Sequence, residues 1–207
     1  YTIMLEVKDI PAMGYKALKV QCIPHERAAP PITMLRGVQA MENEYLRVTF
    51  NANGTYNEVD KENGKTYNGL NFFKDSAEIG DPWQHILPEN YEIFTTLNTN
   101  AKITLVHEGQ LETTFRVQID WALPEGRTLD EKSRSPHLNP CQITSLVSLR
   151  KGCRWVDVQT TVFNNSEDHY LQVGFPTGIQ SEFSYAQGQF DVLKRQIEKL
   201  DYSLFDE

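Results

Sequence analysis

The chain has 207 residues, of which 40% are hydrophobic and 23% charged, and its formal net charge is −8. This composition is typical of a folded soluble protein with one large domain, or one domain and an extension. The acidic balance, without a cluster of Lys or Arg, disfavours nucleic acids and anionic membranes as partners. No run approaches the roughly 20 apolar residues that a membrane helix needs.

The first residues and the cysteines bear on the cellular compartment. No basic region followed by an apolar stretch begins at Tyr1, so no signal peptide is visible, and without an initiator Met the N-terminus is interpreted as a cut. Cys22, Cys141 and Cys153 are odd in number and far apart. This pattern disfavours a disulfide framework and a thiolate zinc site. We expect free thiols in a reducing compartment, and hence a cytoplasmic protein.

The chain divides into two predicted parts. Residues 1–33 are predicted to hold one or more N-terminal strands and a linker from a preceding region, because Pro24, Pro30 and Pro31 interrupt residues 22–33. Residues 34–207 are predicted to form a β-sandwich domain that is cut at its C-terminal end.

Apolar and polar residues alternate along much of the second part. Leu46, Val48 and Phe50 alternate with polar neighbours, as expected of a strand with one buried and one hydrated face. Similar patterns predict strands at 45–50, 103–107, 111–119, 143–149, 154–163 and 170–175.

The predicted strands are separated by residues that favour turns. The Asn-Gly pairs at 53–54 and 63–64 favour type I′ hairpin turns, and residues 107–110 predict a short hairpin. Residues 123–140, which contain three Pro and one Gly, are predicted to be a long loop. Short strands with tight turns predict an antiparallel sandwich or barrel. Residues 191–207 have helical apolar spacing, but 190–193 could also continue a strand, so a short C-terminal helix stays an alternative.

The residues alone reveal no catalytic motif. None of the five His has a ligand neighbour at helical spacing, and the sequence contains no His-Glu-x-x-His, no Gly-x-Ser-x-Gly and no phosphate-binding loop. Carboxylates are frequent, but no pair that could cleave a glycosidic bond can be selected from spacing. The residues therefore indicate an antiparallel β protein, with a polar ligand as an open alternative.

Several segments, in order, resemble the C-terminal region of the glycoside hydrolase family 38 α-mannosidases. They cover nearly the whole chain, although each motif is weak by itself. The matching segments are 11–15, 41–48, 53–55, 60–64, 80–83, 163–165, 168–169, 175–176 and 190–192 with Arg195. The sequence departs from the family where bacterial members often have Asp-His-Arg-Leu-Arg, since residues 168–172 read Asp-His-Tyr-Leu-Gln.

The resemblance implies an antiparallel β-sandwich of the galactose-mutarotase-like kind, also called a supersandwich. It implies an accessory segment of a zinc-dependent retaining α-mannosidase, which scaffolds and partly walls the substrate cleft. The resemblance places the nucleophile and the zinc in a missing barrel, so no catalytic residue, metal ligand or cofactor is expected in this segment, which should be inactive alone. It should pack on the missing barrel and helical domains, and its carbohydrate partner would be an α-mannoside.

The resemblance also suggests substrate-binding residues. Trp83 matches a family aromatic that reaches the sugar, and aromatic faces stack well on a pyranose; the alternative is a core or edge aromatic. Arg195 matches an arginine that lines the cleft, with a hydrated surface arginine as the alternative. Asp81 and His85 are weaker candidates, which could instead stabilise a turn.

Two other functions stay open. A freestanding carbohydrate-binding module would need an exposed aromatic platform, for which Trp83, Trp121 and Trp155 are candidates. An aldose epimerase, suggested only by analogy of fold, would need a paired His and carboxylate in one cleft, with His85 or His169 as the His.

Overall fold

The structure, a computed structural model, describes residues 4–21, 32–81 and 83–197. The chain forms two units, Tyr1–Pro176 and Thr177–Glu207, each of which is described by itself. Within the described ranges the regular structure is almost entirely strand, with one three-residue 3-10 helix, η1 (Thr96–Asn98). None of the helical structure in those ranges is long and apolar enough to cross a membrane.

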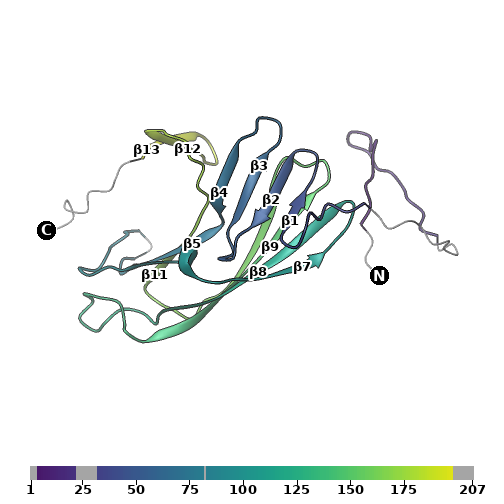
Figure 1. The fold of residues 1–207 in the computed structure, drawn as a ribbon. Helices are drawn as coiled ribbons and strands as arrows, with labels where there is room; N and C mark the ends of the chain where they lie inside the picture. The colour runs from purple at the N-terminus through teal and green to yellow at the C-terminus, as the bar shows by residue number, and fades with distance from the viewer. Residues whose placement is uncertain (1–3, 22–31, 82, 198–207) are drawn as a thin grey trace. The chain divides into compact units, whose positions relative to one another are not determined.

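Two four-stranded antiparallel sheets form the body of the first unit (Figure 1). The first sheet has the order β1-β2-β3-β4 and contains β1 (Ala40–Glu42), β2 (Leu46–Phe50), β3 (Tyr56–Asp60) and β4 (Thr66–Leu70). The second sheet has the order β10-β9-β8-β7 and contains β7 (Lys102–His107), β8 (Glu112–Pro124), β9 (Leu138–Arg150) and β10 (Val156–Phe163).

The core lies between these two sheets. Alternate residues of β2 and β8 are buried, and the rings of Phe50 and Phe115 meet with their centroids 4.8 Å apart. The turn after β2 also rests on the second sheet, because a Cβ added at Gly54 would lie 2.8 Å from side-chain atoms of Ala101 and Val117. The alternation read from the sequence therefore buries one face of each sheet, as in a sandwich.

A third antiparallel sheet lies at one end of the first unit. It has the order β11-β5-β6 and contains β5 (Phe72–Ala77), β6 (Ile93–Thr95) and β11 (His169–Gly174). Asn71, with a φ of 67°, makes the sharp turn from β4 into β5. The second unit contains one antiparallel hairpin, β12 (Phe183–Gln187) with β13 (Val192–Gln196).

The strand predictions are confirmed, whereas the predicted turn type is wrong. All six predicted strands overlap observed ones, namely β2, β7, β8, β9, β10 and β11. In a type I′ turn both central residues need positive φ. Gly54 and Gly64 have it, at 86° and 71°, but Asn53 and Asn63 do not. These connections are longer loops. In each Asn-Gly pair only the glycine adopts the left-handed backbone conformation.

The predicted loop at 123–140 is also corrected, since β8 continues to Pro124 and β9 begins at Leu138. Pro140 is tolerated in β9 because pairing with β10 ends at Gln142, so the N–H that proline lacks is not needed on that side. Instead, the Asn165 side chain donates to the Pro140 carbonyl at 2.8 Å. The loop is therefore limited to residues 125–137.

Both ends of the chain differ from expectation where they are described. Residues 4–21 contain no strand, and residues 1–3 and 22–31, which include most of the predicted linker, lie outside the described residues. At the other end β13 is a strand, so the helical alternative is wrong for residues 192–196, while residues 198–207 lie outside the described range. The division at residue 33 stays a prediction.

Candidate functional site

The loop that follows β5 carries three of the four residues predicted to bind substrate, Asp81, Trp83 and His85. Glu78 closes this loop, because its Oε1 accepts from the N–H groups of Gly80 (2.8 Å) and Ile86 (2.9 Å). The N–H of Ile79 also donates to the carbonyl of Ile86 at 2.9 Å. A single carboxylate therefore binds both ends of the segment that we call the Trp83 loop (residues 80, 81 and 83–86).

Within the Trp83 loop, Asp81 shapes the backbone and leaves the indole free. Its Oδ1 accepts from the N–H groups of Trp83 and Gln84, both at 2.8 Å, as Asp side chains commonly do in turns. Position 80 requires a glycine, because the carbonyl oxygen of Gln84 lies where a Cβ would be. Trp83 is 90% exposed. Asp81 thus holds the N–H groups of Trp83 and Gln84, while the side chain of Trp83 faces solvent.

His85 connects the Trp83 loop to the neighbouring sheet. Its Nδ1 contacts Oε2 of Glu78, and its ring lies 5.5 Å from that of Tyr170 on β11. Tyr170 is 47% exposed. His85 therefore joins the loop to Glu78, while its role in binding substrate stays a prediction.

Beneath this surface lies a buried ionic cluster, the Asp75 cluster, formed by Asp75, Arg134 and His169. Asp75 Oδ2 contacts Nη1 of Arg134, and Oδ1 contacts Nδ1 of His169. The three side chains are 0%, 2% and 7% exposed. A buried carboxylate of this kind is stable only when it is paired, and here the two partners come from the 125–137 loop and from β11.

The guanidinium of Arg134 is only partly satisfied by hydrogen bonds. Its Nε and Nη2 are buried with no hydrogen-bond partner, while its face lies 5.3 Å from the centre of the Phe94 ring on β6. This cation–π contact offsets some of the lost hydration. The Asp75 cluster therefore holds β5, β6, β11 and the 125–137 loop together at the end of the unit that carries the Trp83 loop.

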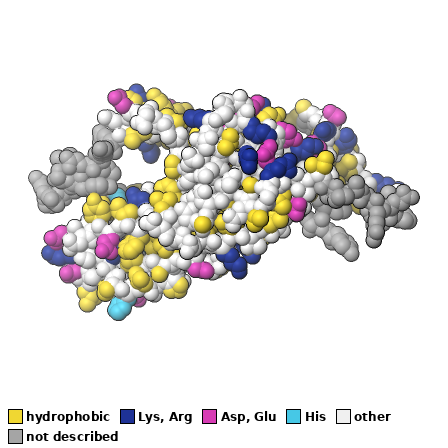
Figure 2. Space-filling model, in the orientation of Figure 1, with side chains coloured by type: hydrophobic (Ala, Val, Ile, Leu, Met, Phe, Trp, Pro, Cys, Tyr) yellow, Lys and Arg dark blue, Asp and Glu magenta, His cyan; other side chains and the backbone are white. Residues whose placement is uncertain are grey.

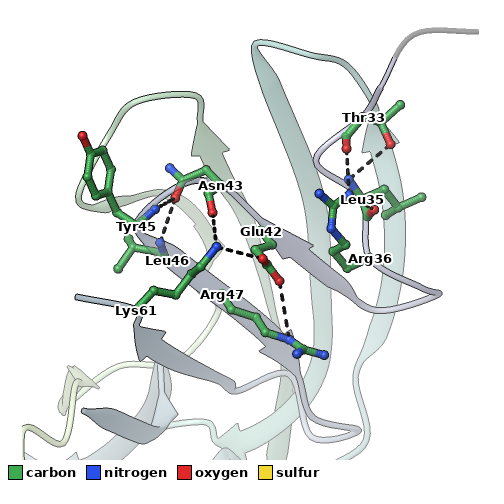
Figure 3. A network of polar contacts seen from close by, with 9 residues as sticks. All are labelled: Thr33, Leu35, Arg36, Glu42, Asn43, Tyr45, Leu46, Arg47 and Lys61. Atoms are coloured by element: carbon green, nitrogen blue, oxygen red, sulfur yellow. Dashed lines mark hydrogen bonds and ion pairs between the residues drawn. The ribbon is translucent and has the colours of Figure 1, made fainter. Parts of the chain in front are cut away.

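The other polar network, shown in Figure 3, is structural. Asn43 Oδ1 accepts from the N–H groups of Tyr45 (2.9 Å) and Leu46 (2.8 Å), and its Nδ2 donates to carbonyls of Arg150 and Cys153, both at 2.7 Å. It thereby joins the turn before β2 to the turn after β9.

Lys61 extends this network. It bridges Glu42 and the Asn43 carbonyl, each at 2.9 Å, and its ammonium lowers the pKa of Glu42. The polar groups that surround Glu42 and Asn43 in Figure 3 thus stabilise the turns of the first sheet, and Asn43 alone among them also bonds to the turn after β9.

The remaining predicted residues separate into exposed and buried positions. Arg195 lies exposed on β13 of the second unit, in register with Ser184. Trp155 is 58% exposed, whereas Trp121 is 8% exposed and cannot serve as a binding platform. The suggestion that Trp121 could lie on the surface is wrong. Strand β8 continues without a break to Trp121, which is six residues after Phe115, so both side chains point to the buried face of the sheet.

The described residues offer little for covalent or metal chemistry. Over the described ranges, no three His, Cys, Asp or Glu side chains gather closely enough to hold a metal ion. Burial, followed by the charge of Asp75, raises the pKa of the Cys141 thiol, which keeps it protonated and a poor nucleophile. The site so defined is an exposed aromatic loop on a rigid β scaffold, a geometry suited to binding.

Comparisons with known proteins agree with this class of β-sandwich. The model of the glycosyl hydrolases family 38 C-terminal domain matches residues 41–204. The chain therefore belongs to glycoside hydrolase family 38, as the C-terminal domain of that family.

Individual relatives are much longer than this chain. A "Putative mannosylglycerate hydrolase" of Halalkalibacterium halodurans is 22% identical over 172 residues, which are 76% of this chain and 19% of the relative. An α-mannosidase from Enterococcus faecalis V583 has a TM-score of 0.78 and 26% identity, over 84% of this chain and 22% of that one. A second family 38 structure from Enterococcus faecalis has a TM-score of 0.77 and 26% identity, over 82% and 22%. The chain thus spans about a fifth of the length of these relatives.

Sequence reasoning missed the Asp75 cluster and the role of Glu78. The members of the cluster are separated by 59 and 94 positions along the chain, so no spacing rule connects them. One sequence feature could have indicated the cluster. Asp75 lies two residues from both Phe73 and Ala77 on β5, so it points to the same buried face as they do. A carboxylate at an inward position requires a buried partner, although the sequence does not identify it.

Proposed function

We propose that this chain is the accessory β-sandwich of a zinc-dependent, retaining α-mannosidase, in which it supports the catalytic part and walls part of the substrate cleft. Membership of family 38 and the small share of each relative that the chain covers support this role. The zinc and the nucleophile belong, in this proposal, to the rest of the parent enzyme. The chain itself contributes shape and binding contacts.

The observation that carries the proposal is that Trp83 is exposed while its own backbone N–H is held by Asp81. An aromatic ring that is open to solvent offers an apolar face on which a sugar can stack. Trp83 is 90% exposed, yet Asp81 accepts hydrogen bonds from the N–H groups of Trp83 and Gln84. Such an indole is ready to stack on the apolar face of a pyranose without a large ordering cost.

The other predicted binding residues take different roles in this proposal. Asp81 positions the loop, since its oxygen is occupied by backbone N–H groups. His85 is proposed to offer a polar atom to the sugar from the same loop, next to the ring of Tyr170. Arg195, on β13, is proposed separately as a forked donor to sugar hydroxyls.

The surface next to the Trp83 loop suits contact with the rest of the enzyme. Ile93 and Tyr170 flank Ser76 across the third sheet and, with Ile86, are between 43% and 50% exposed. Figure 2 shows hydrophobic side chains gathered at the end of the first unit where β5 and β11 lie. We assign this face to packing on the barrel and helical domains, because contiguous exposed apolar surface favours an interface.

The alternatives receive less support as the main function. An epimerase would need an accessible His and carboxylate, but His169 is buried against Asp75 and His85 is engaged by Glu78. The binding-module alternative retains Trp83 and Trp155 as exposed aromatics. Cytoplasmic localisation is proposed on the free thiols Cys141 and Cys153.

The test uses the complete open reading frame that contains this chain. With an aryl α-mannoside, Trp83→Ala should lower kcat/KM about tenfold, or about 1.4 kcal/mol. Leu129→Ala, at a fully exposed position of the 125–137 loop, is the matched control and should leave kcat/KM unchanged. Chelation of zinc should abolish activity of the full-length protein.

Two results would contradict the proposal. One is an unchanged kcat/KM for Trp83→Ala in the full-length enzyme. The other is turnover by the purified 207-residue chain that disappears when one of its own carboxylates is replaced.

A further inference from the structure

The outer face of the second sheet carries an ordered row of polar residues. The registers place His107 opposite Thr114, Thr114 opposite Ser148, and Ser148 opposite Asp157, so one row crosses β7, β8, β9 and β10. Neighbouring strands lie roughly 4.8 Å apart, which spaces these groups regularly across the sheet. The face is hollowed here, and the hollow encloses about 510 Å³.

The side chains that line this hollow hold one another in place. Arg150 donates from Nε to Glu112 Oε2 at 2.8 Å, and its Nη1 lies 3.6 Å from Asp157 Oδ2. The hydroxyls of Thr114 and Ser148 are 2.8 Å apart. A binding surface whose polar groups are already fixed loses less conformational entropy when a ligand arrives.

Trp155 adjoins the hollow and is oriented by the same network. Its indole Nε1 donates to Asp157 Oδ1 at 3.2 Å, while 58% of the residue stays exposed. More than half of this aromatic residue is therefore accessible to a ligand while its indole N–H is held. We call this surface the Trp155 groove (Glu112, Thr114, Ser148, Arg150, Asp157 and Trp155).

The charges in the Trp155 groove disfavour an anionic ligand. It contains two carboxylates and one guanidinium, which gives one net negative charge, and the whole chain carries −8. The hydrogen bond that Arg150 donates to Glu112, followed by the charge of Asp157, raises the pKa of Arg150, so this guanidinium is charged and already paired. Hydroxyls, carboxylates and an aromatic face together suit a neutral ligand with many hydroxyl groups.

We propose that the Trp155 groove is a second carbohydrate-binding site, which takes a neutral oligosaccharide by stacking one sugar on Trp155 and bonding its hydroxyls to the row on the second sheet. The site is separate from the Trp83 loop. Glu112 and the Trp155 groove lie at one end of β8, whereas the loop after Pro124 meets the Asp75 cluster at the other end. Twelve residue steps along a strand span on the order of 40 Å. The groove would hold a glycan chain while the parent enzyme acts elsewhere on it.

Calorimetry with the 207-residue chain tests the proposal, using mannobiose and soluble α-mannan as probes. We expect binding that Trp155→Ala weakens about tenfold, or about 1.4 kcal/mol. Trp155→Phe should retain most of the affinity, because it keeps an aromatic face. Leu129→Ala is the control and should bind as the parent does. Mannose 6-phosphate should bind no more tightly than mannose.

Nuclear magnetic resonance gives a second readout that needs no variant. The chain has three Trp, and therefore three indole N–H signals. Mannobiose should shift the signal of Trp155 and leave that of buried Trp121 in place.

Several results would overturn the proposal without touching the proposed function. One is the absence of both heat and indole shifts with either probe. Another is binding that Trp83→Ala removes and Trp155→Ala leaves intact, since this would assign the sugar to the Trp83 loop alone. Tighter binding of the phosphorylated sugar would contradict a neutral ligand.

Discussion

Two buried regions of the first unit are stabilised in different ways. Between β2 and β8, apolar side chains such as Phe50 and Phe115 fill the space, and burial of their surface provides the stability. At the other end, Asp75 is just as deeply buried but depends on Arg134 and His169. The first region tolerates changes of shape that keep apolar volume, whereas the second requires that every charge keep its partner.

The largest expected effect belongs to the apolar region. Phe115→Ala should lower the free energy of unfolding by about 4 kcal/mol, because it removes a fully buried ring and leaves a cavity. Urea denaturation followed by circular dichroism measures the change. Phe115→Leu, which keeps most of the apolar volume, should cost much less. Equal losses for the two variants would show that volume is not what this core requires.

The Asp75 cluster should respond next most strongly. Asp75→Asn should cost about 3 kcal/mol, because it leaves the buried guanidinium of Arg134 without its counter-charge. The matched control is Asp168→Asn, which breaks a 3.4 Å ion pair with Arg127 at the surface and should cost less than about 1 kcal/mol.

A triple replacement sharpens the same comparison. The triple variant combines Asp75→Leu, Arg134→Met and His169→Leu. Its free energy of unfolding should lie within about 1 kcal/mol of the parent's, or exceed it, because no buried charge remains. A triple variant as unstable as Asp75→Asn would show that the ionic contacts themselves are required.

A smaller effect is expected in the Trp83 loop. Gly80→Ala should cost about 1–2 kcal/mol, because the added Cβ overlaps the Gln84 carbonyl and the backbone must move. The emission of Trp83 should shift as the loop changes. Gly126→Ala is the control, since its nearest neighbour would lie at an ordinary 3.4 Å. Identical melting curves for the two variants would argue against the tight loop.

The smallest expected effect depends on pH. Burial, followed by the charge of Asp60, raises the pKa of Glu58 above its usual 4.5. A carboxyl whose pKa is raised on folding adds stability below pH 4.5, and this contribution is lost as the pH rises through the folded-state pKa. Glu58→Gln should therefore have a higher Tm than the parent at pH 7 and an equal one below pH 4.5. Exposed Glu92→Gln is the control, and a gain for Glu58→Gln that does not change with pH would contradict the assignment.

The outcome of the sequence predictions follows the same division between the two regions. The strands that build the apolar core were predicted, because alternation along β2, β8 and β10 is a local signal. The extent of β8 was underestimated, because Pro124 read as a breaker although it falls at the last paired position. Trp121, which was only a candidate for an exposed aromatic, is buried because it continues the inward face of β8.

The candidate site was predicted in part. The resemblance selected Asp81, Trp83 and His85, and the structure brings these three into one loop, while Arg195 lies in the second unit. The roles of Glu78 and of the Asp75 cluster could not be predicted, because their partners are distant in sequence. Trp155 was one of three candidate aromatics, and only its bond to Asp157 and the adjoining hollow distinguish it.

The sequence by itself determined the sandwich, since a two-residue period divides each strand into an apolar and a polar face regardless of what the strand meets. It also determined family membership through short motifs in a fixed order. Only the tertiary structure decided which carboxylates are buried, which aromatics face water and which polar rows align across strands. The physical reason is that charge pairing and exposure depend on contacts between residues tens of positions apart, and these contacts exist only after the sheets have packed.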